Sequence, residues 1–156
     1  MAKEHRYTAT VTWTGNQGGG TTDYKAYTRD YDIGCAGKPL IQGSADPGYL
    51  GDAGRHNPED MLLASLSACH MLWYLHLCAT NKVVVTAYED AAEGVMQTNP
   101  DGSGEFKRVT LKPRITITPD SDATTAESLH EKANAMCFIA RSVNFPVEHA
   151  AEISSG

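Results

Sequence analysis

The stretch NPEDMLLASLSACHMLWYLHLCAT, residues 57–80, decides how the chain folds. Asn57 is a good helix N-cap, Pro58 suits the first helical position, and the acidic Glu59-Asp60 opposes the positive end of a helix dipole. From Met61 to Ala79 the apolar residues wrap nearly all round the helix, which is typical of a helix buried on every side. The sequence therefore predicts a long central helix.

Charge and composition exclude several classes of partner. The 156 residues carry a formal net charge of -6 without a basic stripe, so neither nucleic acid nor an anionic membrane surface is expected to bind. Residues 61–81 contain no Asp, Glu, Lys or Arg and are long enough to span a membrane. Polar side chains interrupt them, however, including Ser65, His70 and His76. We therefore expect a buried helix rather than a membrane span.

The cysteines point to a reducing compartment. The first residues, Met1–Arg6, are charged and precede no apolar stretch, so we expect no secretory signal and a cytoplasmic protein. Cysteines in such a compartment are more often reactive, metal-bound or buried than joined in structural disulfides. A metal site would have to use Cys69, His70, His76 and Cys78, which scatter around the helix without a C-x-x-C pair. We expect neither a metal nor a cofactor.

An α+β pattern surrounds the helix. Strands are expected at residues 7–13, 21–28, 30–35, 83–96, 106–118 and 143–153. A long irregular loop covers residues 43–56, and a second helix is expected from the capping-box-like Thr124-Thr125-Ala126-Glu127 to about Met136. The order β-β-β-α-β-β-α-β, with no repeat and no linker, predicts a single α+β domain over residues 1–156. One sheet face cannot cover a helix that is apolar all round, so we also expect a second subunit.

Cys69 is the candidate nucleophile. It lies twelve residues after Asn57, beyond the reach of the helix N-terminus, so a thiolate there needs a local cation. Arg55 and Glu59 stand at the start of this helix, and a guanidinium held by a carboxylate can supply that cation. Because Glu59 and Cys69 are roughly 15 Å apart along one helix, we expect them to meet between antiparallel helices of two subunits. The alternatives are an inert buried Cys69 and an exposed Arg55–Glu59 pair.

Further candidates surround the cysteine. Leu72 and Trp73 share a helical face with Cys69, which indicates either an apolar pocket or plain core. His70 projects about 100° away from Cys69, and we predict a structural histidine there. Cys137 ends the second helix, where both a disulfide with Cys69 and an inert thiol are possible.

Two segments resemble the OsmC/Ohr family. The first combines Asn57-Pro58-Glu59, Leu62-Leu63-Ala64 and Ser67-Ala68-Cys69-His70-Met71, which is similar to the family signature. The second combines Cys137-Phe138-Ile139-Ala140 with Ser142-Val143-Asn144-Phe145-Pro146-Val147, which resembles the second cysteine segment of an OsmC-like branch. With the order of elements and the length, the likeness covers essentially the whole chain.

The resemblance implies a fold and an activity. The fold would be OsmC-like, with antiparallel sheets around the buried central helix in an intertwined homodimer. The activity would be reduction of organic hydroperoxides through a sulfenic acid on Cys69, followed by a Cys69–Cys137 disulfide. Arg55 and Glu59 would serve the thiolate, and a lipoyl or thioredoxin-like dithiol protein would reset the disulfide. The substrate pocket would be formed by Leu72, Trp73 and Phe138.

The chain departs from the family pattern at the arginine. Ohr-type members carry it after the first strand in a Gly-Gly-Arg-like turn, whereas this chain has Gly15-Asn16-Gln17. The role passes to Arg55, or to Arg29, or is missing. The alternative function is therefore an OsmC-like protein that binds a small apolar ligand without efficient peroxidase activity.

Overall fold

The expected central helix is present as α1, Pro58–Thr80, in the computed structural model, which describes residues 3–156. Its first turn is capped as the sequence predicts. The backbone N–H of Asp60 donates to Asn57 Oδ1 at 2.8 Å, and that of Asn57 donates back to the Asp60 carboxylate at 3.3 Å. The chain divides near this turn into an N-terminal unit, residues 1–61, and a C-terminal unit, residues 62–156. The expectation of one domain over residues 1–156 stays a prediction.

The N-terminal unit is built on one small antiparallel sheet. Its strands, in the order β1-β2-β3, are β1 Thr10–Trp13, β2 Tyr31–Gly34 and β3 Ile41–Gly43, and a short 3-10 helix, η1 Pro47–Tyr49, follows. The strand expected at residues 21–28 is wrong, because this segment forms turns. Within it, the Lys25 N–H donates to the Asp23 side chain at 2.9 Å, and the Ala26 N–H donates to the Asp23 carbonyl at 3.0 Å. Such side-chain bonds compete with a strand for the backbone.

The C-terminal unit carries two further sheets. Their strands are β4 Val85–Asp90, β5 Glu93–Thr98, β6 Gly104–Leu111, β7 Pro113–Ile117, β8 Val147–His149 and β9 Glu152–Ser155, in the orders β4-β7-β9 and β5-β6-β8. The long strands expected at 83–96 and 106–118 are each divided between the two sheets. The break lies where Pro113 lacks an N–H and where the Lys112 N–H donates to Asp90 at 2.7 Å.

The second helix, α2, spans Ala123–Met136, and the 3-10 helix η2 follows at Ala140–Ser142. Its cap differs from the expected one. Asp122, and not Thr124, accepts the backbone hydrogen bonds of Thr124 and Thr125, both at 3.2 Å. Asp122 thereby satisfies two of the free donors at the helix start.

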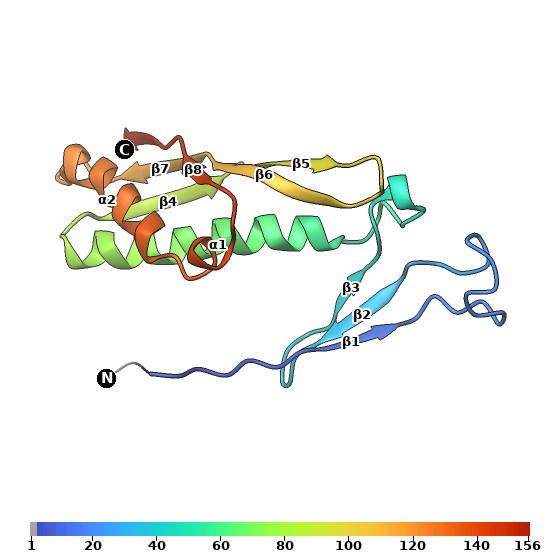
Figure 1. Cartoon of the computed structure of the whole chain (residues 1–156). Coiled ribbons are helices and arrows are strands. Elements are labelled where there is room, and N and C mark those ends of the chain that lie inside the picture. The colour runs from blue at the N-terminus through green and yellow to red at the C-terminus, as the bar shows by residue number, and fades with distance from the viewer. Residues whose placement is uncertain (1–2) are drawn as a thin grey trace. The chain divides into compact units, whose positions relative to one another are not determined.

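Two apolar clusters form the core of the C-terminal unit. The larger lies between α1, β7 and α2 and includes Tyr74, Ile115 and Leu129. The smaller joins α1 to β6 through Leu66, Val109 and Leu111. Figure 1 shows α1 running along the strands of this unit, with α2 near its C-terminal half. The mixture of helices and mainly antiparallel sheets confirms the α+β fold class.

Helix α1 is less covered in one chain than its sequence suggests. By length and composition the helix could span a membrane, since its mean hydropathy is 1.4. Within the chain itself, 28% of that stretch is buried. The central helix of a globular protein passes the same length test. The expected burial on every side is therefore not reached within one chain, where Leu72 is 63% exposed.

Candidate active site

Cys69 lies in the middle of α1, on a turn that is tied to the sheets. Ser67 donates a hydrogen bond of 2.5 Å to Asp90, which also accepts the backbone N–H of Lys112. Because Asp90 ends β4 and Lys112 precedes β7, one carboxylate joins the Cys69 turn to both strands. The Cys69 side chain is half-buried and is thus open to small reagents.

Cys137 lies beside Cys69. It caps the C-terminus of α2, is 1% exposed, and accepts a hydrogen bond of 3.4 Å from the Ala140 N–H on its sulfur. Its thiol is close enough to Cys69 for the two groups to interact, and both thiols are free. Burial first, and then the neighbouring Cys69, raise the pKa of Cys137 to about 11. The structure thus brings together one accessible sulfur and one buried, protonated sulfur.

The three residues expected to form an apolar pocket lie near this pair of sulfurs in the C-terminal unit. Leu72 and Trp73, with His76, line a hollow of about 220 Å³ on α1. The rings of Trp73 and Phe138 meet edge to face with their centroids 5.5 Å apart. Phe138 directly follows Cys137 and is 65% exposed, so it forms an apolar surface beside the buried sulfur.

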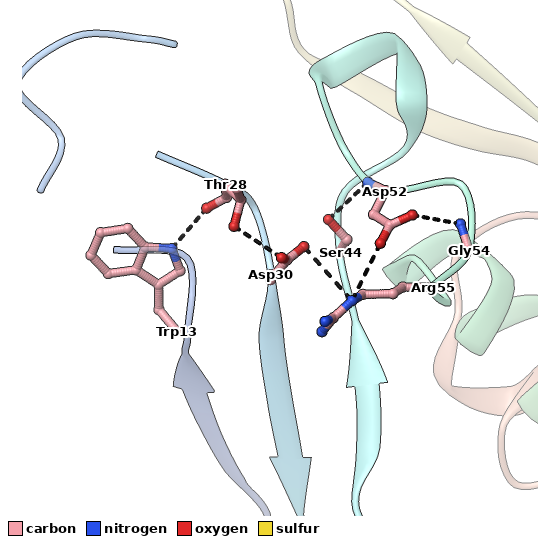
Figure 2. Close-up of polar contacts among 7 residues, drawn as sticks. All are labelled: Trp13, Thr28, Asp30, Ser44, Asp52, Gly54 and Arg55. Carbon is pink, nitrogen blue, oxygen red and sulfur yellow. Dashed lines mark hydrogen bonds and ion pairs between the residues drawn. The ribbon is translucent and has the colours of Figure 1, made fainter. Parts of the chain in front are cut away.

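Arg55 has carboxylate partners other than the one expected from the sequence. It lies just before α1 in the N-terminal unit, where its Nε is 3.5 Å from Asp52 and 3.9 Å from Asp30 (Figure 2). Asp52 is itself held in place by the Gly54 N–H, at 2.8 Å. The expected Arg55–Glu59 pair is not among the ion pairs of residues 3–156. Arg55 therefore ties the loop before α1 to the start of β2.

Arg29 shares a cleft with Glu59 in the N-terminal unit. Its guanidinium lies over the rings of Tyr24 and Tyr27, 4.4 and 4.2 Å from their centroids. It also donates hydrogen bonds of 2.6 and 2.7 Å to the backbone carbonyls of these tyrosines. The cleft has a volume of about 380 Å³ and is lined by Trp13, Tyr27, Arg29, Tyr31, Ser44, Ala45, Asp46, Tyr49, Pro58 and Glu59. Of the two candidate arginines, Arg29 is thus the one that lies in a cleft with Glu59.

Sequence reasoning missed two polar residues of these sites. Asp90 looks like an ordinary strand residue, and its link to Ser67 depends on a contact across 23 positions. Tyr31 looks like a β-forming residue of a strand, and its place in the cleft depends on the register that sets it opposite Gly43. Neither role has a signal in the local pattern.

A buried pair of histidines lies on another face of α1. His70 and His130 are almost completely buried, and His70 Nε2 is 3.0 Å from His130 Nδ1. Burial is the main cause that lowers the pKa of His70 to about 4 and that of His130 to about 3. His149 and Tyr74 border the pair. Within residues 3–156 no group of three or more His, Cys, Asp or Glu side chains has a metal-binding arrangement.

The sequence matches one protein family. The family OsmC, described as OsmC-like protein, matches residues 51–152, which include α1, Cys69 and Cys137. None of the curated proteins compared with the chain is a significant match.

Solved structures with this fold extend over nearly the whole chain. An OsmC-like protein of unknown function from Vibrio cholerae is 30% identical, with a TM-score of 0.87, and the alignment covers 96% of this chain and 100% of that one. An organic hydroperoxide resistance protein from Elizabethkingia anophelis is 19% identical, with a TM-score of 0.70 and 100% of both chains covered. The organic hydroperoxide resistance protein OhrB of Bacillus subtilis is 19% identical, with a TM-score of 0.59, and covers 95% of this chain and 98% of its own. The expected OsmC-like fold is confirmed.

Proposed function

The chain belongs to the OsmC family, and we propose that it is a thiol-dependent peroxidase that reduces organic hydroperoxides at Cys69. The observation that carries the proposal is the pair of sulfurs, half-buried Cys69 beside buried Cys137. The likeness to two organic hydroperoxide resistance proteins supports this class of substrate.

The first chemical step oxidises Cys69. Its thiolate attacks the terminal oxygen of the hydroperoxide, the one that carries the hydrogen, so that an S–O bond forms and the O–O bond breaks. The other peroxide oxygen leaves as an alkoxide and takes up a proton to become an alcohol. Cys69 is left as a sulfenic acid.

The second step closes a disulfide. The Cys137 sulfur attacks the sulfenic sulfur of Cys69, and water leaves. Because the sulfurs are neighbours in the folded chain, this step needs no encounter with a second molecule. A dithiol protein of the lipoyl or thioredoxin-like kind then reduces the disulfide in the cytoplasm, where free thiols persist.

A second subunit completes the site in this proposal. Cys69 needs a cation, and within the N-terminal unit Arg29 shares a cleft with Glu59. The partly exposed apolar helix α1 and the uncovered sheet β1-β2-β3 favour a homodimer that buries them. In such a dimer the cleft of one subunit faces Cys69 of the partner subunit. Arg29 then replaces Arg55 as the residue beside the thiolate, and Glu59 balances its charge.

Replacing the two cysteines separately tests the proposal. In stopped-flow assays with cumene hydroperoxide, Cys69→Ser should lose turnover, because the attacking sulfur is gone. Cys137→Ser should allow one oxidation and then stall, because the sulfenic acid has no partner. Cys35→Ser, which removes a thiol of the N-terminal unit, is the matched control and should keep the full rate. Full turnover by Cys69→Ser would contradict the proposal.

A second candidate function is binding of a small apolar ligand without efficient peroxidase activity. Its support is Arg55, whose guanidinium is held by Asp30 and Asp52. The same kinetic assay separates the two functions. Loss of thiol no faster than that of free cysteine, in the reduced wild-type protein, would leave ligand binding as the better account.

A further inference from the structure

We propose that Tyr31 is a catalytic residue, which donates a hydrogen bond and then its proton to the alkoxide that leaves during peroxide reduction. This inference rests on the proposed function and deepens it, since it assigns the source of the proton in the first step. Tyr31 lines the cleft of the N-terminal unit that contains Arg29 and Glu59.

The hydroxyl of Tyr31 is a donor without an acceptor. Among residues 3–156 the buried side-chain atoms that lack a hydrogen-bond partner are Tyr31 Oη, Tyr88 Oη, His70 Nδ1 and His130 Nε2. A buried hydroxyl without a partner costs about 1–3 kcal/mol, so such a group is expected where a ligand supplies the missing bond. Tyr31 is the member of this set that lies in the cleft with Arg29 and Glu59.

The ring of Tyr31 is fixed by a glycine across the sheet. Tyr31 on β2 lies opposite Gly43 on β3. A Cβ atom at position 43 would stand 2.3 Å from Cζ of the Tyr31 ring, so the ring fills the space that a side chain would take. The hydroxyl is therefore held in place before any ligand binds, as a transition-state donor requires.

Two other polar groups of the cleft are engaged, and its other phenols, Tyr27 and Tyr49, are not among the buried hydroxyls without a partner. Both terminal nitrogens of Arg29 donate to backbone carbonyls. Ser44 Oγ already accepts the Asp52 N–H at 3.1 Å. An ordinary tyrosine is protonated near neutral pH, and burial first, and then the charge of Glu59, raise the pKa of the Tyr31 phenol further. Tyr31 can thus donate a proton, whereas the neighbouring Glu59 carboxylate can only accept a hydrogen bond or a proton.

The proton transfer balances without another reagent. Thiolate attack breaks the O–O bond and leaves the electron pair on the alkoxide oxygen. Tyr31 O–H gives its proton to that oxygen, because an alkoxide is a stronger base than a phenolate. The alcohol departs, and the Tyr31 phenolate takes a proton from water. A general acid of this kind contributes about 10²–10⁴-fold to a rate.

Two peroxides with different leaving groups test the role of Tyr31. Cumene hydroperoxide releases an alkoxide that needs a proton, whereas peracetic acid releases a stable carboxylate that does not. The test is stopped-flow oxidation of reduced protein in which every subunit carries the substitution. Tyr31→Phe should lower the rate constant about 10²-fold with cumene hydroperoxide. With peracetic acid the rate constant should stay within about 2-fold, because no proton is needed in that step.

The matched control is Tyr88→Phe, which removes the other buried and unpartnered phenol, in the C-terminal unit. It should leave both rate constants unchanged. Equal losses with both peroxides in Tyr31→Phe, or no loss with either, would overturn the role of Tyr31 while the peroxidase proposal stands. A wild-type rate with cumene hydroperoxide no faster than that of free cysteine would overturn both.

Discussion

The two units of the chain differ in what they bury. All buried hydrophobic side chains among residues 3–156 belong to the C-terminal unit, whereas the buried residues of the N-terminal unit are Gly15, Gly43 and Ser44. The chemistry is divided as well. The neighbouring sulfurs of Cys69 and Cys137 lie in the C-terminal unit, and the cleft with the guanidinium and carboxylate lies in the N-terminal unit. One unit thus contains the buried apolar core and the proposed attacking sulfur, and the other contains the guanidinium and the carboxylate of the cleft.

Acid should destabilise the chain through the histidines of the C-terminal unit. His70 and His130 have pKa values lowered to about 4 and about 3 by burial, against 6.5 for an ordinary histidine. Because the unfolded chain binds more protons, their contribution is complete above pH 6.5 and is lost as the pH falls toward 4. At pH 5 each histidine should lower the free energy of unfolding by about 2 kcal/mol.

Urea unfolding at pH 7.5 and at pH 5 measures this loss. His130→Gln should reduce the difference between the two pH values, because one buried titrating group is gone. His56→Gln changes an exposed histidine of the N-terminal unit and should leave the difference as it is. Equal pH dependence in both variants would contradict the assignment of the acid sensitivity to the buried histidines of the C-terminal unit.

Truncating one leucine in each unit should show which unit depends on a buried apolar core. Leu66 of α1 is fully buried against β6, so Leu66→Ala should lower the free energy of unfolding by about 2–5 kcal/mol. Leu40 of the N-terminal unit is 63% exposed, and Leu40→Ala should cost about 0.5 kcal/mol or less. Chemical denaturation of the two variants gives both values. If Leu40→Ala lowers the free energy of unfolding as much as Leu66→Ala, Leu40 is buried in solution. It would then lie either in a core of the N-terminal unit or against a partner subunit.

Local signals explain which parts of the fold the sequence predicts well. Helix α1 begins where Asn57 and Pro58 indicate, because caps and first-turn residues act within a few positions. The division of the long strands was missed, since alternation continues across the break near Pro113 while the partner strands change. The turns at residues 21–28 were missed because the β-forming residues are outweighed by hydrogen bonds that the Lys25 and Ala26 N–H groups donate to Asp23.

The candidate site shows the limit of sequence reasoning more clearly. Cys69 stands out through its place in the central helix, and its neighbour Cys137 through the resemblance to a family. The ion pair of Arg55 with Asp30 is different, because Asp30 is 25 positions away in the sequence and no local pattern links the two. Tyr31 carries no local signal either, since its environment is created by the register between β2 and β3. Contacts between distant segments decide these cases.

Mapping the thiols after a single oxidation tests the central claim most directly. Fully reduced protein would be treated with one equivalent of cumene hydroperoxide, alkylated and digested for mass spectrometry. We expect one Cys69–Cys137 disulfide, with Cys35 and Cys78 alkylated as free thiols. A Cys69 oxidised to sulfinic acid beside a free Cys137, or a disulfide that omits Cys69, would contradict it.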